Sequence, residues 1–508
     1  MKLRHTAFIL PIVLLMCSTS LFAQLETAKP ASPNASPEAK ALLQLIYNLS
    51  GNHTLTGQHN YPSSKDRNSK FAAGYSGKTP AIWSTDFGFA KEGDKDSYLM
   101  RSAMVEEAKR QNKMGAIITL CWHAVPPTAA EPITFQPVPG ADPAHLASVQ
   151  GTLTDQQFQD ILTPGTDLNK KWMAQVDTIA HYLKELQKAH IAVLWRPYHE
   201  MNGSWFWWGN RVGKYSTQAL YRQIFERLVN YHKLNNLIWV WSVDRPTKPG
   251  MEFSNFYPGN KYLDILALDV YGSDFNQSYY DTLLGLSKGK PITLAEVGNP
   301  PSPEILEKQP KWSYWVIWAG MTRNTSKKQY EILNNDPRVI GLDDPAYINA
   351  VNPFRATLGL PLLSLTKPAD FSGEWVLNED KSTLGNGGSG NLPYKLKIGQ
   401  KENELQLQKS YIEEWTDDRV TDEKMKLNGE ESKSVYFNAP LITTANLSPS
   451  GDELLIKSKA TFNRGGQTME MSTNETWHLE NKGKTLSITQ SSKSFRGERT
   501  VTLVYDKQ

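Results

Sequence analysis

Short apolar runs alternate with amphipathic stretches over residues 38–365 of the chain. The apolar runs are eight, at residues 54–57, 81–87, 116–122, 192–196, 237–243, 265–271, 292–297 and 314–318. Helical spacing of apolar residues marks 98–112, 168–189 and 217–233 between them, and 37–49 before the first. Buried strands separated by helices predict a parallel (β/α)8 barrel, a TIM barrel. An open doubly wound sheet is the alternative, but the first run is not followed by a Gly-rich phosphate loop.

The pattern changes after residue 365. Residues 366–370 read as a linker, and the runs beyond it are short, alternating and separated by turn residues, at 394–398, 405–411, 454–459, 469–477, 486–489 and 499–505. They predict a smaller all-β domain of about eight to ten antiparallel strands at 366–508. Its opening, Phe371-Ser-Gly-Glu-Trp375, resembles that of lipocalin-like barrels, which carry a Gly-x-Trp near the first strand.

The N-terminus is typical of an export signal. Lys2, Arg4 and His5 precede an apolar run at 7–16 that is too short to span a bilayer. We therefore predict a signal peptide at 1–23, an Ala/Ser/Pro-rich linker at 24–37, no transmembrane segment, and a secreted or periplasmic protein. Lipid attachment at Cys17 is the alternative, although the bulky Met16 fits that cleavage poorly.

Composition narrows the class of partner. The formal charge of +3 is nearly balanced, so nothing predicts binding to nucleic acid. The chain has 15 Trp and 21 Tyr, an aromatic excess that suits stacking on sugar rings. Cys121 is the only cysteine beyond Cys17, which leaves the mature protein without an internal disulfide. The spacing of His, Cys and acidic residues predicts no metal site, and we expect no cofactor and a monomer.

The densest chemistry lies at 193–209, Val-Leu-Trp-Arg-Pro-Tyr-His-Glu-Met-Asn-Gly-Ser-Trp-Phe-Trp-Trp-Gly. Pro197 removes a backbone donor, so the buried strand should end there. An ordinary core would not place Arg196, His199 and Glu200 at the end of such a strand, because unpaired buried charge is costly. A sugar-binding cleft explains the combination, since Trp faces stack on pyranose rings and a desolvated Glu holds a proton near neutral pH.

The stretch 195–209 resembles the acid/base signature of glycoside hydrolase family 26, whose best-known members are β-mannanases. The resemblance covers about residues 38–365 and implies that Glu200, past the fourth strand, is the acid/base. Glu296, at the end of the seventh strand, would be the nucleophile. Two carboxyls so placed would lie about 5–5.5 Å apart, the spacing of a retaining glycosidase. An ion pair with a barrel arginine is the purely structural alternative for these glutamates.

The resemblance also assigns residues that bind substrate or orient the carboxylates. Those that match the family's pattern are His199, Arg196, Asp269, Tyr271, Trp205 and Trp318, and His123 is a candidate contact at the end of the third strand. Tyr271 would hydrogen-bond the nucleophile, and Arg196 would orient a carboxylate. Trp205 and Trp318 would stack on sugars beside the cleaved bond.

The sequence therefore predicts a secreted endo-acting β-1,4-mannanase that cuts mannan, glucomannan or galactomannan. The same chemistry on mixed-linkage β-glucan or β-1,3-xylan is the first alternative, and a non-catalytic glycan-binding protein is the second. A long proline-rich insertion at 125–164 would make the enzyme exo-acting if it closes one end of the cleft. The sequence does not say what the C-terminal domain does.

Overall fold

The computed structural model divides the chain into two compact units, Met1–Leu363 and Ser364–Gln508. It describes residues 28–88, 97–363, 369–384, 392–401, 403–413, 416–436, 439–447, 453–464, 467–494 and 497–508. The predicted signal peptide, with Cys17, lies outside the described residues. Part of the predicted linker is bound to the first unit, because the Ala31 amide donates to Asp264 Oδ1 (2.5 Å) and the Ser36 amide to the Asn235 carbonyl (2.8 Å).

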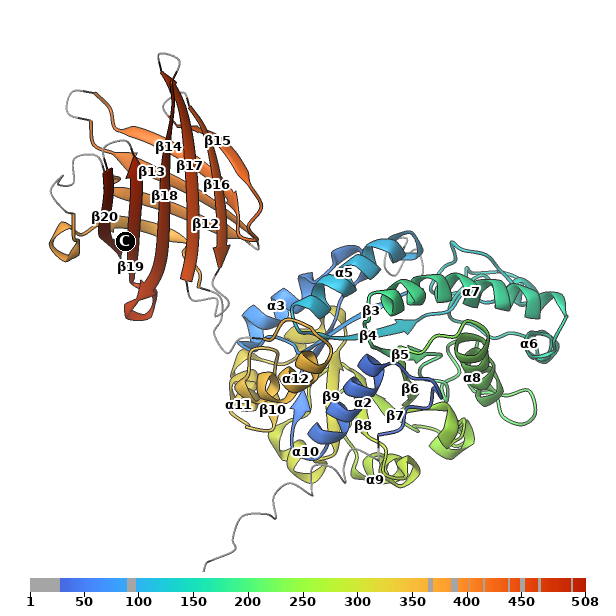
Figure 1. Cartoon of the computed structure of the whole chain (residues 1–508). Coiled ribbons are helices and arrows are strands. Elements are labelled where there is room, and N and C mark those ends of the chain that lie inside the picture. Colours follow the sequence, from blue (N-terminus) through green and yellow to red (C-terminus); the bar gives the residue numbers. More distant parts are fainter. Residues whose placement is uncertain are drawn as a thin grey trace, which may run out of the picture. The chain divides into compact units, whose positions relative to one another are not determined.

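The first unit is a closed barrel of parallel strands (Figure 1). Its strands are β1 (Thr54–Leu55), β2 (Gly57–His59), β3 (Ile82–Asp86), β4 (Ile117–Trp122), β5 (Val193–Pro197), β6 (Leu237–Asp244), β7 (Ile265–Val270), β8 (Ile292–Val297) and β9 (Trp312–Ile317). β1 and β2 together form the first barrel strand, and pairing of β8 with β9 closes the ring. β10 (Val339–Ile340) adds a short pair to β1. The predicted TIM barrel is confirmed.

Helices surround the barrel strands (Figure 1). They are α2 (Pro37–Leu49), α3 (Arg67–Ser76), α5 (Arg101–Lys113), α6 (Asp155–Leu162), α7 (Asp167–Lys188), α8 (Thr217–Phe225), α9 (Gln277–Ser287), α10 (Pro303–Lys308), α11 (Lys327–Asn334) and α12 (Pro345–Thr357). Local sequence explains their starts: Thr166 and Ser216, for example, cap α7 and α8 by accepting backbone amides. α8 continues as a π-helix, Glu226–Tyr231, so the predicted helix at 217–233 is one path with two hydrogen-bond patterns. No described helix is long and apolar enough to cross a membrane.

Every residue of β1 to β9 is buried. Strands covered by helices on one face and by barrel packing on the other need continuous apolar runs, which is the pattern in the sequence. Buried polar residues are concentrated where these strands end, as with Asp86, Arg196, Asp269 and Glu296. The carboxyl ends of the strands therefore carry polar groups that the core itself does not need.

The second unit is a nearly closed antiparallel barrel (Figure 1). Its strands are β11 (Gly373–Leu377), β12 (Lys395–Lys401), β13 (Glu404–Tyr411), β14 (Arg419–Lys426), β15 (Ser432–Tyr436), β16 (Ala439–Leu447), β17 (Glu453–Arg464), β18 (Gln467–Glu480), β19 (Thr485–Ser494) and β20 (Gly497–Lys507). Ten described strands in the order β14-β13-β12-β11-β20-β19-β18-β17-β16-β15 confirm the all-β antiparallel prediction. Trp375, Leu405, Trp477 and Tyr505 are among its fully buried side chains.

Candidate active site

The predicted site residues gather at the carboxyl end of the first barrel. Arg196 lies within β5, Asp269 within β7 and Glu296 within β8. His123, Tyr271 and Trp318 each follow the last residue of β4, β7 and β9 directly, and His199, Glu200 and Trp205 follow β5. Strand ends of a parallel barrel meet at one rim, so residues far apart in sequence are brought together.

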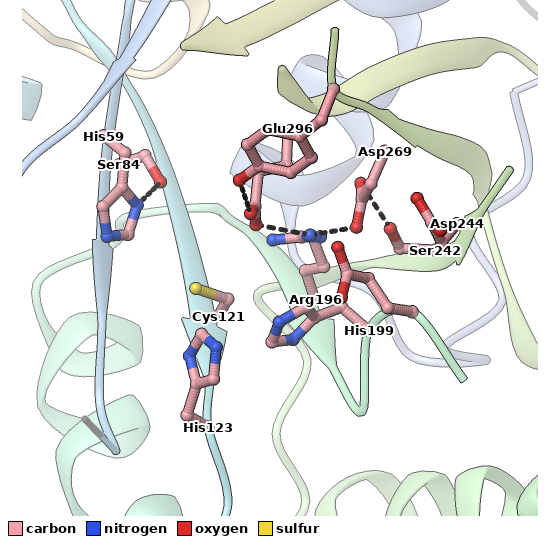
Figure 2. A network of polar contacts seen from close by, with 12 residues as sticks. His59, Ser84, Cys121, His123, Arg196, His199, Ser242, Asp244, Asp269 and Glu296 are labelled. Carbon is pink, nitrogen blue, oxygen red and sulfur yellow. Dashed lines mark hydrogen bonds and ion pairs between the residues drawn. The ribbon is translucent and has the colours of Figure 1, made fainter. Parts of the chain in front are cut away.

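Glu296 is held by two donors, one on β5 and one directly after β7. Arg196 Nη2 donates to Glu296 Oε2 (2.9 Å), and the Tyr271 hydroxyl donates to Glu296 Oε1. Arg196 Nη2 also bonds Asp269 Oδ2 (2.5 Å), and Figure 2 shows its guanidinium between the two carboxylates. Asp269 and Glu296 are paired in the register of β7 and β8. The glutamate is thus fixed in orientation and balanced by a cation.

Asp269 is the second acid that shares the buried Arg196. Burial raises the pKa of Asp269 to about 7, the nearby Arg196 opposes this rise, and Glu296 adds to it. Ser242 Oγ donates to the other oxygen of Asp269 (2.8 Å). Asp269 therefore has donors on both oxygens, and its role in this network is to position Arg196.

Glu200 lies in a strained turn. Tyr198 and Glu200 both have left-handed backbones, with φ of 50° and 51°. Such conformations cost about 1–3 kcal/mol for residues other than glycine and persist only where surrounding contacts hold them. Here the Trp208 indole donates to the His199 carbonyl (2.9 Å), and the Trp172 indole donates to the Tyr198 hydroxyl (2.9 Å). The turn that directs Glu200 is therefore fixed by packed tryptophans.

The environment of Glu200 favours its protonated form. The pKa of Glu200 is raised well above its ordinary value by burial first, and then by the negative charges of Glu296, Asp269 and Asp244. Trp205 Nε1 donates to Glu200 Oε2 (2.6 Å) and orients the carboxyl group. A protonated Glu200 and an arginine-bound Glu296 in one site can serve as acid and nucleophile.

Aromatic and imidazole rings line the site beside these carboxyls. His59 and Trp318 are stacked with ring centroids 4.0 Å apart, and His123 meets His199 edge-on at 4.4 Å. Phe206 lies 5.1 Å from the His199 ring. Burial lowers the pKa of His59 to about 3, and burial together with Arg196 lowers the pKa of His199 well below its ordinary value. Both imidazoles are therefore neutral.

Among the described residues, neither His59 Nε2 nor His199 Nδ1 has a hydrogen-bond partner. The other ring nitrogen of His59, Nδ1, lies 2.9 Å from Ser84 Oγ (Figure 2). A buried polar nitrogen without a partner is costly unless a ligand satisfies it.

Asp86 is a residue that the sequence analysis missed. Its Oδ1 accepts the backbone amides of Gly88 (2.7 Å) and His123 (3.1 Å). Its Oδ2 accepts Cys121 Sγ (2.9 Å) and His123 Nδ1. Burial alone would raise the pKa of Asp86, but the adjacent His123 and these donors hold it well below its ordinary range. Since a carboxylate only accepts, His123 Nδ1 carries the proton of this hydrogen bond.

The same three side chains are the candidate metal ligands among the residues that the structure describes. One ligand atom each of Asp86, Cys121 and His123 lies within 4.8 Å of the others. Asp86 Oδ2 already accepts hydrogen bonds from both partners, and burial raises the pKa of the Cys121 thiol well above its ordinary value. This donor set is satisfied by protons, so we assign no metal to it, and the expected absence of metal and cofactor stays a prediction.

Comparison with known proteins assigns the chain to a family. The model of glycosyl hydrolase family 26 matches residues 31–344. The chain belongs to glycosyl hydrolase family 26. The predicted family and the predicted enzyme class, a glycoside hydrolase, are thereby confirmed.

Individual members of family 26 are similar over the same part of the chain. A mannan endo-1,4-beta-mannosidase of Thermothelomyces thermophilus is 31% identical over 301 residues, which cover 58% of each chain, so the present chain spans little more than half of that relative. A mannan endo-1,4-beta-mannosidase of Bacillus subtilis is 29% identical over 62% of this chain and 89% of its own. The solved structure of GH26A from Muricauda sp. MAR_2010_75 is 42% identical, covers 61% of this chain and 98% of its own, and superposes with a TM-score of 0.56.

Proposed function

We propose that this chain is a secreted β-mannanase that hydrolyses β-1,4-mannosidic bonds with retention of anomeric configuration. The observation that carries the proposal is the contrast between two carboxyls, Glu200 with a raised pKa and Glu296 bound by Arg196 and Tyr271. Relatives named mannan endo-1,4-beta-mannosidase favour mannan, glucomannan or galactomannan as substrate.

The first step forms a bond between a Glu296 oxygen and the anomeric carbon. The bond from that carbon to the leaving sugar oxygen breaks, and Glu200 transfers its proton to that oxygen. Arg196 and Tyr271 hold the attacking carboxylate in place, so little reorganisation is needed. The products are a shortened chain and a glycosyl ester on Glu296.

The second step releases this ester. Ester formation removes the negative charge of Glu296, which lowers the pKa of Glu200 and leaves Glu200 ionised. Glu200 then takes a proton from water, the water oxygen bonds the anomeric carbon, and Glu296 leaves as a carboxylate. Two inversions at one carbon give net retention.

The remaining residues bind the sugar. His199 directly precedes Glu200, and Asp86 orients the ring of His123 by accepting its Nδ1–H. Trp205 and Trp318 are partly exposed indoles beside the carboxyls, a position suited to stacking on pyranose rings. Asp269 acts on the reaction through Arg196.

Two alternative functions differ from the proposed one in the polymers that the protein would cleave. The same chemistry on mixed-linkage β-glucan or β-1,3-xylan depends on contacts to individual hydroxyls, and a non-catalytic glycan-binding protein would need no proton-holding Glu200. Reducing-sugar release from glucomannan, galactomannan, lichenan and β-1,3-xylan separates them. Cleavage of mannans alone supports the proposal, cleavage of lichenan or xylan alone overturns the substrate, and no release from any polymer overturns the activity.

Retention is tested on the first product. Proton NMR during the first minutes of mannopentaose hydrolysis should show the β-anomer before mutarotation. Appearance of the α-anomer first would establish inversion and remove Glu296 from its role as nucleophile. A ladder of intermediate oligosaccharides from mannan would support endo action, and a single short product would support exo action.

Export and the second unit are part of the same proposal. N-terminal sequencing of the exported protein should begin at Gln24, and lipid on Cys17 would contradict cleavage there. The lipocalin-like character of the second unit stays a prediction. Removing residues 364–508 and comparing soluble with insoluble mannan would tell whether this unit delivers the enzyme to insoluble substrate.

A further inference from the structure

The rim of the first barrel carries a second arginine beside the candidate active site. Arg245 directly follows Asp244, the last residue of β6, and 20% of its side chain is exposed. Its Nη1 donates to the Tyr271 carbonyl (2.7 Å), and the same nitrogen lies 3.8 Å from Asp274 Oδ2. Its Nε donates to Asp244 Oδ1 (3.4 Å). Arg245 therefore joins the end of β6 to the loop that follows β7.

The loop after β7 adopts a conformation that needs such contacts. Gly272 and Ser273 both have left-handed backbones, with φ of 67° and 57°. For a residue such as Ser273 this conformation costs about 1–3 kcal/mol and persists only where surrounding contacts hold it. Arg245 bonds Tyr271, the residue before this pair, and forms an ion pair with Asp274, the residue after it. The arginine thus holds the turn at both ends.

The side chain of Tyr271 has little freedom once its backbone is fixed. A Cβ placed on Gly298 would lie 3.0 Å from Tyr271 Cδ1, so the ring packs directly against this glycine. The Gly298 amide in turn donates to the Val270 carbonyl (3.0 Å), in the peptide unit that precedes Tyr271. At the far end of the ring, the Tyr271 hydroxyl donates to Glu296 Oε1. A shift of the Tyr271 backbone would therefore move this donor relative to the Glu296 carboxylate.

Asp244 connects the same arginine to the turn that carries Glu200. The side-chain amide of Asn202 pairs with the Asp244 backbone in both directions, accepting from its N–H (2.7 Å) and donating to its carbonyl (2.6 Å). Asn202 is fully buried and lies two residues after Glu200. The turn of Glu200, the end of β6 and Tyr271 are thus joined by hydrogen bonds along a path that does not pass through Arg196.

We infer that Arg245 is a positioning residue for the nucleophile: it holds the Tyr271 hydroxyl on Glu296 by fixing the Tyr271 backbone. The inference rests on the proposed function, because it gives Glu296 the role of nucleophile. Arg245 acts through Tyr271 and does not touch the reacting atoms. Without Arg245 the turn relaxes, and Glu296 keeps its bond to Arg196 but loses one of its two donors. The attacking oxygen is then poorly oriented, and a misplacement of about 1 Å can slow a reaction about 100-fold.

The test is a double-mutant cycle with Arg245→Met and Tyr271→Phe. In the wild-type background, Arg245→Met should lower kcat/KM for mannopentaose about 10-fold to 100-fold, through kcat, because the carboxylate is less well oriented. In the Tyr271→Phe background, which has already lost the hydroxyl, the same change should cost only about twofold. Arg222→Met is the matched control, since Arg222 on α8 donates to the Pro258 carbonyl over the same 2.7 Å and its loss should leave kcat unchanged.

A crystal structure of Arg245→Met without substrate measures the positioning itself. We expect the Tyr271 hydroxyl to lie more than about 3.5 Å from Glu296 Oε1, beyond hydrogen-bond distance, while the bond from Arg196 to Glu296 persists. A Tyr271 hydroxyl that stays on Glu296 would overturn the inference. If the wild type cleaves no oligosaccharide, the proposed function fails, and this structure still decides whether Arg245 sets the position of Tyr271.

Three kinetic outcomes would also overturn the inference. Full activity of Arg245→Met would show that the turn after β7 holds its shape without the arginine. Equal losses in the wild-type and Tyr271→Phe backgrounds would show that Arg245 does not act through the Tyr271 hydroxyl. A rise in KM with unchanged kcat would show that Arg245 binds the sugar itself.

Discussion

Both units of this chain are sheets rolled into barrels, but they use their strands differently. Strands β1 to β9 are buried at every position, whereas β12 to β14 alternate between inward residues and exposed ones. A helix-covered parallel barrel has no solvent face on which to place a charge. The charged residues inside this barrel lie where its strands end, and there they belong to the candidate active site.

The ion pairs of the two units show the consequence. The side chains of Arg196 and Glu296 are 5% and 7% exposed, and Asp269 is inaccessible. In the second unit Lys409 and Glu423 lie 2.9 Å apart on neighbouring strands with 16% and 22% of their side chains exposed. The first network has to be complete to be tolerated, while the second remains within reach of water.

The largest expected effect tests whether the first network is catalytic. Glu296→Ala should lower kcat on glucomannan by about 10⁴-fold or more, because no other group can form the glycosyl ester. Glu200→Ala should be comparably slow on mannan but should still release a first equivalent of nitrophenol from aryl mannosides, whose leaving group needs no proton, before the ester accumulates without its base. Reducing-sugar assays and release of nitrophenol measure the two.

Circular dichroism of both variants serves as the folding control. Equal activity of Glu296→Ala and wild type would mean that Glu296 is only an ion-pair partner of Arg196. In that case the buried ion pair of the first barrel would be purely structural, like the pair of Lys409 and Glu423 in the second barrel.

The next effect compares the stability of the two ion pairs. Arg196→Met leaves Asp269 and Glu296 buried without their cation, which should destabilise the first unit by about 3–5 kcal/mol. Lys409→Met leaves Glu423 partly hydrated and should cost about 1.5–3 kcal/mol or less. Urea unfolding followed by Trp fluorescence measures both, and equal losses would contradict the contrast drawn from exposure.

A smaller effect is expected from Asp86. Asp86→Asn replaces an acceptor-only group with one that can donate, so His123 loses its fixed tautomer and kcat/KM should fall about 10–100-fold. The matched control is Asp177→Asn, which removes a carboxylate bonded to Arg227 and His232. If Asp86→Asn keeps full activity, His123 does not depend on Asp86 for its role.

The sequence was sufficient for the barrel strands and for placing two glutamates where such strands end, while the roles of these glutamates stay predictions. Continuous apolar runs mark strands that are buried on both faces, and Glu200 and Glu296 stand where such runs end. Asp86 stands at the end of β3 in the same way, but without a partner in sequence its purpose was invisible, because Cys121 and His123 meet it only across the sheet. Ser242 and His59 were missed for the same reason.

The second barrel was harder to predict at its charged edge. The strands β14, β15 and β16 were not found individually, because residues such as Asp422, Glu423 and Lys424 in β14 obscure the alternation of apolar side chains. Only Met425 is fully buried in that strand. Such strands are specified by their pairing with β13 and β17, which a local pattern does not reveal.

The smallest expected effect reverses the usual sign of a core mutation. The folded state raises the pKa of Glu200, so it binds a proton that the unfolded chain has lost at neutral pH, and ionisation there costs stability. Glu200→Gln should therefore be inactive yet more stable at pH 7 by on the order of 1 kcal/mol. The gain should shrink as the pH falls through the ordinary pKa range of Glu, where the unfolded side chain is also protonated.

Glu423→Gln in the second barrel should destabilise instead, because it weakens the bond to Lys409. Thermal unfolding at pH 4 and pH 7 separates the two signs, and destabilisation by Glu200→Gln at pH 7 would mean that Glu200 is ionised in the free enzyme.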